Sequence, residues 1–158
     1  MKKAQRIAAL VNSLDLDQST LFDPCYLGYF ERFNARDYYE AHDVLEQLWL
    51  KCGPEAHDYA FYKGLIQLAG GFVHLKLQHA QPDHPKHGRR LAPARRLFLR
   101  AAENLIPYAP RHHGLNLAVP ITLASSFAEL LAQGRDSLNP WNPDQAPRLP
   151  VPSSRNTD

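Results

Sequence analysis

A histidine and a glutamate four residues apart are the first candidates for chemistry in this chain. His42 and Glu46 fall in segment 37–52, whose apolar residues recur at helical spacing. On a helical wheel they lie about 60° and 100° from Leu45, at the edge of the buried stripe. Because residues at i and i+4 project from the same side of a helix, the imidazole and the carboxylate can reach a common point.

The following helix carries a polar stripe of its own. It is predicted over 56–79 and is apolar on nearly every side, yet Gln67 and His74 share one stripe with Gly70 and Gly71. Each glycine in a helix interior costs about 1 kcal/mol relative to alanine, and close approach by another helix would explain that cost. We therefore expect a neighbouring helix to pack against this stripe.

The simplest arrangement places His42 and Glu46 opposite Gln67 and His74, across the glycines. Two interpretations stay open. In the first, the four side chains form a hydrogen-bonded network, because buried ionised groups need partners. In the second, His42, Glu46 and His74 bind a divalent metal ion such as zinc, since two imidazoles and a carboxylate suit such an ion and leave a position for water.

Two further acids on the first of these helices are assigned elsewhere. Glu40 and Asp43 fall nearly opposite Leu45, so we expect both to meet solvent. The D-x-x-E spacing of Asp37 and Glu40 predicts a capping box at the start of the helix.

Two other polar clusters are weaker candidates. The segment 79–90 has two prolines, a glycine and no apolar anchor, so its histidines lie in a solvated loop that does not preorganise metal ligands. An arginine-rich stretch is interpreted as a solvated helix face. Its members are Arg89, Arg90, Arg95, Arg96 and Arg100.

The elements that must position these side chains are helices. About six helical segments and no two-residue alternation predict an all-α fold, a single compact bundle of five to six helices over 1–134. Asp23 before Pro24 predicts a helix start, and Gly134 a left-handed helix end. The proline-rich segment 135–158 is predicted to be an extended tail that packs at most through Trp141.

Composition sets the broad class of the protein. The chain has 158 residues, of which 44% are hydrophobic and 22% charged, as in ordinary soluble proteins. A net charge of +2 gives no reason to expect a nucleic acid partner. No apolar run is long enough to span a membrane, the start lacks a signal-peptide core, and two isolated cysteines fit reduced thiols, so we expect a cytoplasmic protein.

Three features together resemble the domain-of-unknown-function family 309 of small prokaryotic proteins. They are the pattern E-A-H-acid-x-L-E-x-x-W from Glu40 to Trp49, the pattern G-L-I-Q-L-A from Gly64 to Ala69, and the downstream His74. The resemblance covers roughly 24–110. It implies a compact helical bundle and a family described as predicted metal-dependent hydrolases.

On that pattern the shared polar positions are His42, Glu46, Gln67 and His74, with Asp43 where the family usually has Glu. Two functions follow as hypotheses. One is a metal-dependent hydrolase that acts on an unknown small molecule or protein through His42, Glu46 and His74. The alternative is a non-enzymatic interaction or structural module in which the polar cluster is a buried hydrogen-bond network.

Overall fold

The computed structural model describes residues 2–14 and 21–154 and contains six α-helices within these ranges. The helices are α1 (Lys3–Ser13), α2 (Pro24–Asn34), α3 (Tyr38–Cys52), α4 (Tyr59–Ala80), α5 (Leu91–Leu105) and α6 (Ala118–Gln133). The helical prediction is confirmed. It missed a small antiparallel hairpin, β1 (Arg111–His112) and β2 (Leu115–Asn116), and a 3-10 turn at Ile106–Tyr108.

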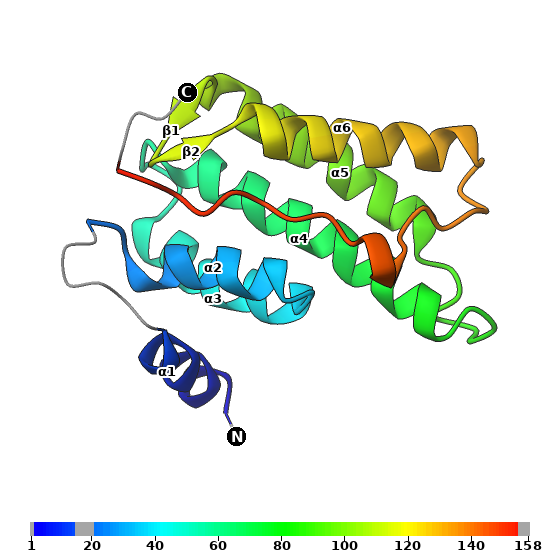
Figure 1. Cartoon of the computed structure of the whole chain (residues 1–158), viewed down its shortest axis with the longest axis horizontal. Coiled ribbons are helices and arrows are strands. Elements are labelled where there is room, and N and C mark those ends of the chain that lie inside the picture. The colour runs from blue at the N-terminus through cyan, green and yellow to red at the C-terminus, as the bar shows by residue number, and fades with distance from the viewer. Residues whose placement is uncertain (1, 15–20, 155–158) are drawn as a thin grey trace.

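Helix α4 lies at the centre of the molecule, with α3 on one side and α5 on the other (Figure 1). Helix α2 packs on α3, and α6 packs on α5. Apolar residues on several sides of α4, such as Phe61, Ile66 and Ala69, are buried, as expected for a central helix. Among the described residues, no helix combines the length and apolarity needed to cross a bilayer.

The glycines of α4 lie against α5. A Cβ atom at Gly71 would fall 2.5 Å from the Phe98 ring, and one at Gly64 would fall 2.8 Å from Leu105. Close approach by a neighbouring helix is therefore confirmed. The expectation that α3 presents His42 and Glu46 across the glycines is wrong, because α5 occupies that side.

Both predicted helix starts are confirmed, but the capping box predicted at the start of α3 is not formed. The Asp23 carboxylate accepts a hydrogen bond from the Cys25 backbone N–H at 2.8 Å and caps α2. At α3, the Asp37 side chain makes no capping bond. The acid predicted to complete that box, Glu40, instead pairs with Arg6 of α1 at 2.7 Å.

Helix α6 ends differently from the prediction. Gly134 has a φ of −80°, so the left-handed conformation is absent there. It occurs at Arg135 and Asp136, whose φ values are 53° and 55°. The Asp136 carboxylate accepts two hydrogen bonds from the Arg95 guanidinium, at 2.9 and 3.0 Å, which ties this turn to α5.

The segment after α6 runs back along the bundle to the hairpin (Figure 1, orange to red). It contains one 3-10 turn, Pro143–Gln145. Trp141 is buried and donates its indole N–H to the Tyr38 hydroxyl at 3.1 Å. Packing extends past Trp141, contrary to expectation, because Leu149 is also buried and its backbone exchanges two hydrogen bonds with the Asn34 side chain.

Candidate functional site

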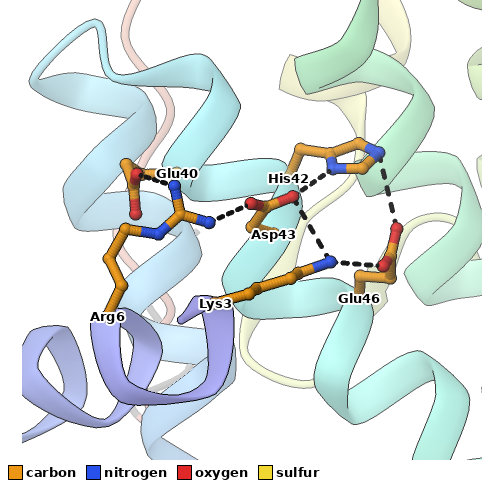
Figure 2. A network of polar contacts seen from close by, with 6 residues as sticks. All are labelled: Lys3, Arg6, Glu40, His42, Asp43 and Glu46. Carbon is orange, nitrogen blue, oxygen red and sulfur yellow. Dashed lines mark hydrogen bonds and ion pairs between the residues drawn. The ribbon is translucent and has the colours of Figure 1, made fainter. Parts of the chain in front are cut away.

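The structure brings His42 and Glu46 together on α3 (Figure 2). Their closest side-chain atoms, His42 Nε2 and Glu46 Oε2, are 3.7 Å apart. His42 Nδ1 lies 3.1 Å from Asp43 Oδ1, and Lys3 of α1 donates to Glu46 Oε1 at 2.7 Å. The pair is therefore part of a network that joins α3 to α1.

Asp43 is the centre of this network, and the expectation that it meets solvent is wrong. Its exposed fraction is 2%, and it is the one buried charged side chain among the described residues. The Arg6 guanidinium binds both Asp43 and Glu40, and Lys3 lies 3.6 Å from Asp43 (Figure 2). Helix α1 covers the side of α3 that a wheel drawn for α3 alone assigns to water.

Gln67 and His74 have partners elsewhere. The Gln67 side-chain oxygen accepts a hydrogen bond from Asn104 of α5 at 2.7 Å. His74 Nδ1 lies 2.9 Å from the guanidinium of Arg90, just before α5. Burial, reinforced by the charges of Arg90 and Arg96, lowers the pKa of His74, so its imidazole is neutral at pH 7.

The predicted ligands His42, Glu46 and His74 thus do not form a group with convergent atoms. Among the described residues, one group of three metal-ligating side chains has its ligand atoms within 4.8 Å of one another, and it is His57, Asp58 and His112. These residues lie at the start of α4 and on the hairpin, on elements other than those of the predicted site.

The Asp58 carboxylate organises this second cluster. Its Oδ1 lies 2.7 Å from His112 Nε2, and its Oδ2 lies 2.6 Å from His113 Nε2. Asp58 immediately precedes α4, but its side chain makes no capping bond with the helix. The carboxylate is instead directed to the two consecutive histidines.

A tight turn presents those histidines. His112 pairs with Leu115 in the hairpin, so His113 and Gly114 are the two central residues of the turn. Both have positive φ, 46° and 70°, as a two-residue turn of type I′ requires. Histidine enters this region more readily than most residues, and glycine does so without steric cost.

Aromatic packing fixes the rings. His112 packs edge-on against Phe61 with ring centroids 4.8 Å apart, and His113 stacks parallel to Tyr62. The Tyr108 ring packs against His112 with centroids 4.9 Å apart, and its hydroxyl donates to the His57 backbone carbonyl at 2.6 Å. The three candidate ligands are therefore positioned by the turn that leads into α4 and by the segment between α5 and α6.

The electrostatics keep the carboxylate ionised. Burial by itself would raise the pKa of Asp58, but the hydrogen bonds and charges of His113 and His112 outweigh it and lower the pKa. A surface pocket of about 400 Å³ borders the cluster. Its lining includes Phe22, Arg111, His112, His113 and Ser153.

Sequence reasoning did not single out His57, Asp58 or His112. The available signals were the dipeptides His57-Asp58 and His112-His113, the latter followed by Gly114. The two dipeptides are separated by all of α4 and α5, so no local spacing connects them.

Comparison with known proteins supports the resemblance seen in the sequence. Residues 26–82 match the family described as Domain of unknown function (DUF309). This match is shorter than the expected range 24–110 and contains His57 and Asp58 but not His112. A metal ion bound by this cluster would therefore have two ligands, His57 and Asp58, within the matched residues 26–82 and a third, His112, in the later hairpin.

The match to a curated protein is also partial. The chain is 33% identical over 60 residues to "Uncharacterized protein YpuF" of Bacillus subtilis (strain 168), which is 37% of this chain and 34% of that protein. The chain therefore spans about a third of the length of this curated relative. No solved structure matches the chain.

Proposed function

We propose that this protein binds a divalent transition metal ion such as zinc through His57, Asp58 and His112, and that the ion serves a hydrolytic reaction. The observation that carries the proposal is the convergence of three ligand atoms within 4.8 Å of one another. Two imidazoles and one carboxylate are a ligand set that zinc uses in hydrolytic enzymes.

The distances suit a metal ion after small side-chain rotations. Ligand atoms about 2.0 to 2.1 Å from a tetrahedral zinc ion lie about 3.3 Å from one another. Asp58 Oδ1 and His112 Nε2 are already 2.7 Å apart. The other carboxylate oxygen accepts a bond from His113, which would hold the ligand's orientation in the way that second-shell partners of metal ligands do.

The hydrolytic part of the proposal rests on the remaining coordination position and on the pocket. Three protein ligands leave a tetrahedral ion one position for water, and a bound ion would supply Lewis acidity and an acidified water molecule. The pocket beside His112 and His113 would bind the substrate.

Zinc titration of chelator-treated, untagged protein by calorimetry tests the metal site. We expect one zinc ion per chain, with affinity reduced at least tenfold in His112→Ala and in Asp58→Asn. His74→Ala is the matched control, because it removes a histidine that the sequence alone proposes as a ligand. Equal affinity in all four proteins would contradict the proposal, and loss in His74→Ala alone would move the site to the helices.

Hydrolysis is tested separately with p-nitrophenyl acetate and bis(p-nitrophenyl) phosphate on the zinc-loaded protein. We expect turnover that disappears in Asp58→Asn and after chelation. Zinc binding without turnover of either ester would support the metal site and remove the support for hydrolysis of these two ester classes.

For the cluster of His42 and Glu46, we propose the structural role of the alternative hypothesis. The burial of Asp43 and its contacts with Lys3 and Arg6 favour that role, because each charged group of the cluster has an opposite charge beside it. If His42→Ala lowers the free energy of unfolding and leaves zinc affinity unchanged, the role is structural. If instead His42→Ala leaves the free energy of unfolding unchanged and lowers zinc affinity, His42 is a metal ligand.

A further inference from the structure

We propose that the acidic face of α3, formed by Glu40, Asp43 and Glu46, is a docking surface for a cationic amphipathic helix of a partner protein. Helix α1 occupies this surface in the structure and competes with that partner. The proposal is independent of the metal site, which lies on other residues.

The first argument is the matched spacing of opposite charges. The three acids are spaced three residues apart on α3, and Lys3 and Arg6 are spaced three apart on α1. Each cation bridges two acids. Lys3 lies between Glu46 at 2.7 Å and Asp43 at 3.6 Å, whereas Arg6 lies between Asp43 and Glu40 (Figure 2).

The second argument is the apolar part of the same surface. A Cβ atom at Gly28 of α2 would fall 3.1 Å from Leu10 and 3.6 Å from Leu14, so the missing side chain makes room for these leucines. Ile7 is buried at the same interface. The surface thus accepts apolar side chains at positions 7 and 10 of a helix and at position 14 just after it, and cations at positions 3 and 6, the pattern by which grooves recognise amphipathic helices.

The third argument is that α1 fits the surface imperfectly. Arg6 Nε is buried without a hydrogen-bond partner among the described residues. The side chains of Lys3, Arg6, Glu40 and Glu46 keep 24 to 42% of their surface exposed, so salt screens their ion pairs. Within α1, Ile7 is the one buried residue. A helix held in this way can be displaced by a similar helix that binds more tightly.

The family match adds a fourth argument. Residues 26–82 contain Gly28 and all three acids of the face, whereas α1 lies before the match. The docking surface therefore lies within the residues that match the family, whereas α1, which occupies that surface, lies outside them.

The test uses the full chain and two fluorescent probes, the peptide of residues 2–14 and a designed Leu/Lys amphipathic helix of the same length. The variant Lys3→Glu/Arg6→Glu should release α1 and leave the acidic face intact. We expect both probes to bind this variant at least tenfold more tightly than the wild-type chain, by fluorescence anisotropy. We also expect affinity to fall when NaCl rises from about 50 to 500 mM, since the interface is ionic.

Control variants distinguish the release of α1 from a general effect of added negative charge on probe binding. Ala8→Glu/Ala9→Glu adds negative charge at exposed positions of α1 and should bind the probes as weakly as the wild type. Ile7→Asp should release α1 by a different route and bind them as tightly as the double charge reversal. Circular dichroism and thermal unfolding establish that each variant retains the bundle.

Three results would overturn the proposal. The first is failure of the folded released variants to bind either probe. The second is unchanged binding when Glu40→Lys/Glu46→Lys is added to the released variant. The third is a wild-type dimer in sedimentation analysis that Lys3→Glu/Arg6→Glu converts to monomer, because the occupant would then be α1 of a second copy.

Discussion

Replacing Asp43 by asparagine should destabilise the protein, although a sequence-based assignment places this residue in solvent. Asparagine has nearly the same shape, so the substitution removes charge and leaves packing unchanged. In the wild-type protein the carboxylate is 2% exposed and contacts Arg6, Lys3 and His42. In the variant, Arg6 and Lys3 lose their shared buried anion.

The expected loss of stability in Asp43→Asn depends on how exposed its two cationic partners are. Breaking a fully buried ion pair costs about 3 to 5 kcal/mol, because an unpaired charge is left behind. Here Lys3 and Arg6 remain 42% and 34% exposed and can be hydrated, so the cost approaches that of a hydrogen bond to a charged group, about 1.5 to 3 kcal/mol. For a chain of this size the melting temperature falls by about 2 to 4 °C per kcal/mol, so we expect it to be about 3 to 12 °C lower.

Urea unfolding monitored by circular dichroism measures the change, with Glu103→Gln as the control, since Glu103 is exposed. The control should change the free energy of unfolding by less than about 0.5 kcal/mol. A double-mutant cycle with Arg6→Met should give a coupling energy of about 1 kcal/mol or more between Arg6 and Asp43. A loss below about 0.5 kcal/mol for Asp43→Asn, with no coupling, would refute the assignment of α1 as the cover of this carboxylate.

Three other predictions concern packing and pH. Gly71→Ala places a Cβ atom 2.5 Å from the Phe98 ring and should lower the free energy of unfolding by about 1 to 3 kcal/mol through overpacking, whereas the Cβ of Gly70→Ala lies 3.3 Å from a leucine methyl and should leave stability nearly unchanged. Urea unfolding compares the two variants, and equal losses of stability would contradict the packing of α4 on α5. Trp141→Ala should cost about 3 to 5 kcal/mol, and a loss below about 1 kcal/mol would show that residues 135–154 do not contribute to the folded core. Because the pKa of Asp58 is lowered in the folded state, the stabilisation from its carboxylate is present above the unfolded pKa of about 3.9 and disappears as pH falls through the folded value. Asp58→Asn should therefore flatten the dependence of unfolding free energy on pH in this acid range, and an unchanged slope would contradict the conclusion that the Asp58 carboxylate is ionised.

Hydrophobic periodicity predicted the helices because it is a local property of the chain. The continuous apolar character of residues 56–79 correctly placed a helix at the centre of the bundle. The same reasoning failed for Asp43, because a single-helix wheel cannot show that a second amphipathic helix lies on the polar side. It failed for Gly70 and Gly71 for a related reason, since a gap in a helix surface predicts a neighbour without saying which helix fills it.

The metal-site candidate lay beyond local reasoning for a different reason. His112 and Asp58 meet across 54 residues, and their contact depends on the left-handed turn at His113-Gly114. The predicted site combined the i,i+4 pair His42 and Glu46 with Gln67 and His74 on the next helix. In the structure, however, His74 and Gln67 are hydrogen-bonded to Arg90 and Asn104. A tertiary contact between two short histidine-containing segments leaves no periodic signal in the sequence.

The central claim is that His57, Asp58 and His112 share one metal ion. Anomalous scattering at the zinc absorption edge, measured on crystals of the zinc-loaded protein, tests it most directly. The predicted result is a strong peak bonded to His57, His112 and one oxygen of Asp58, with His113 still on the other oxygen. Zinc found instead at His74 or only among the histidines of loop 79–90, or no ordered zinc at all, would contradict the claim.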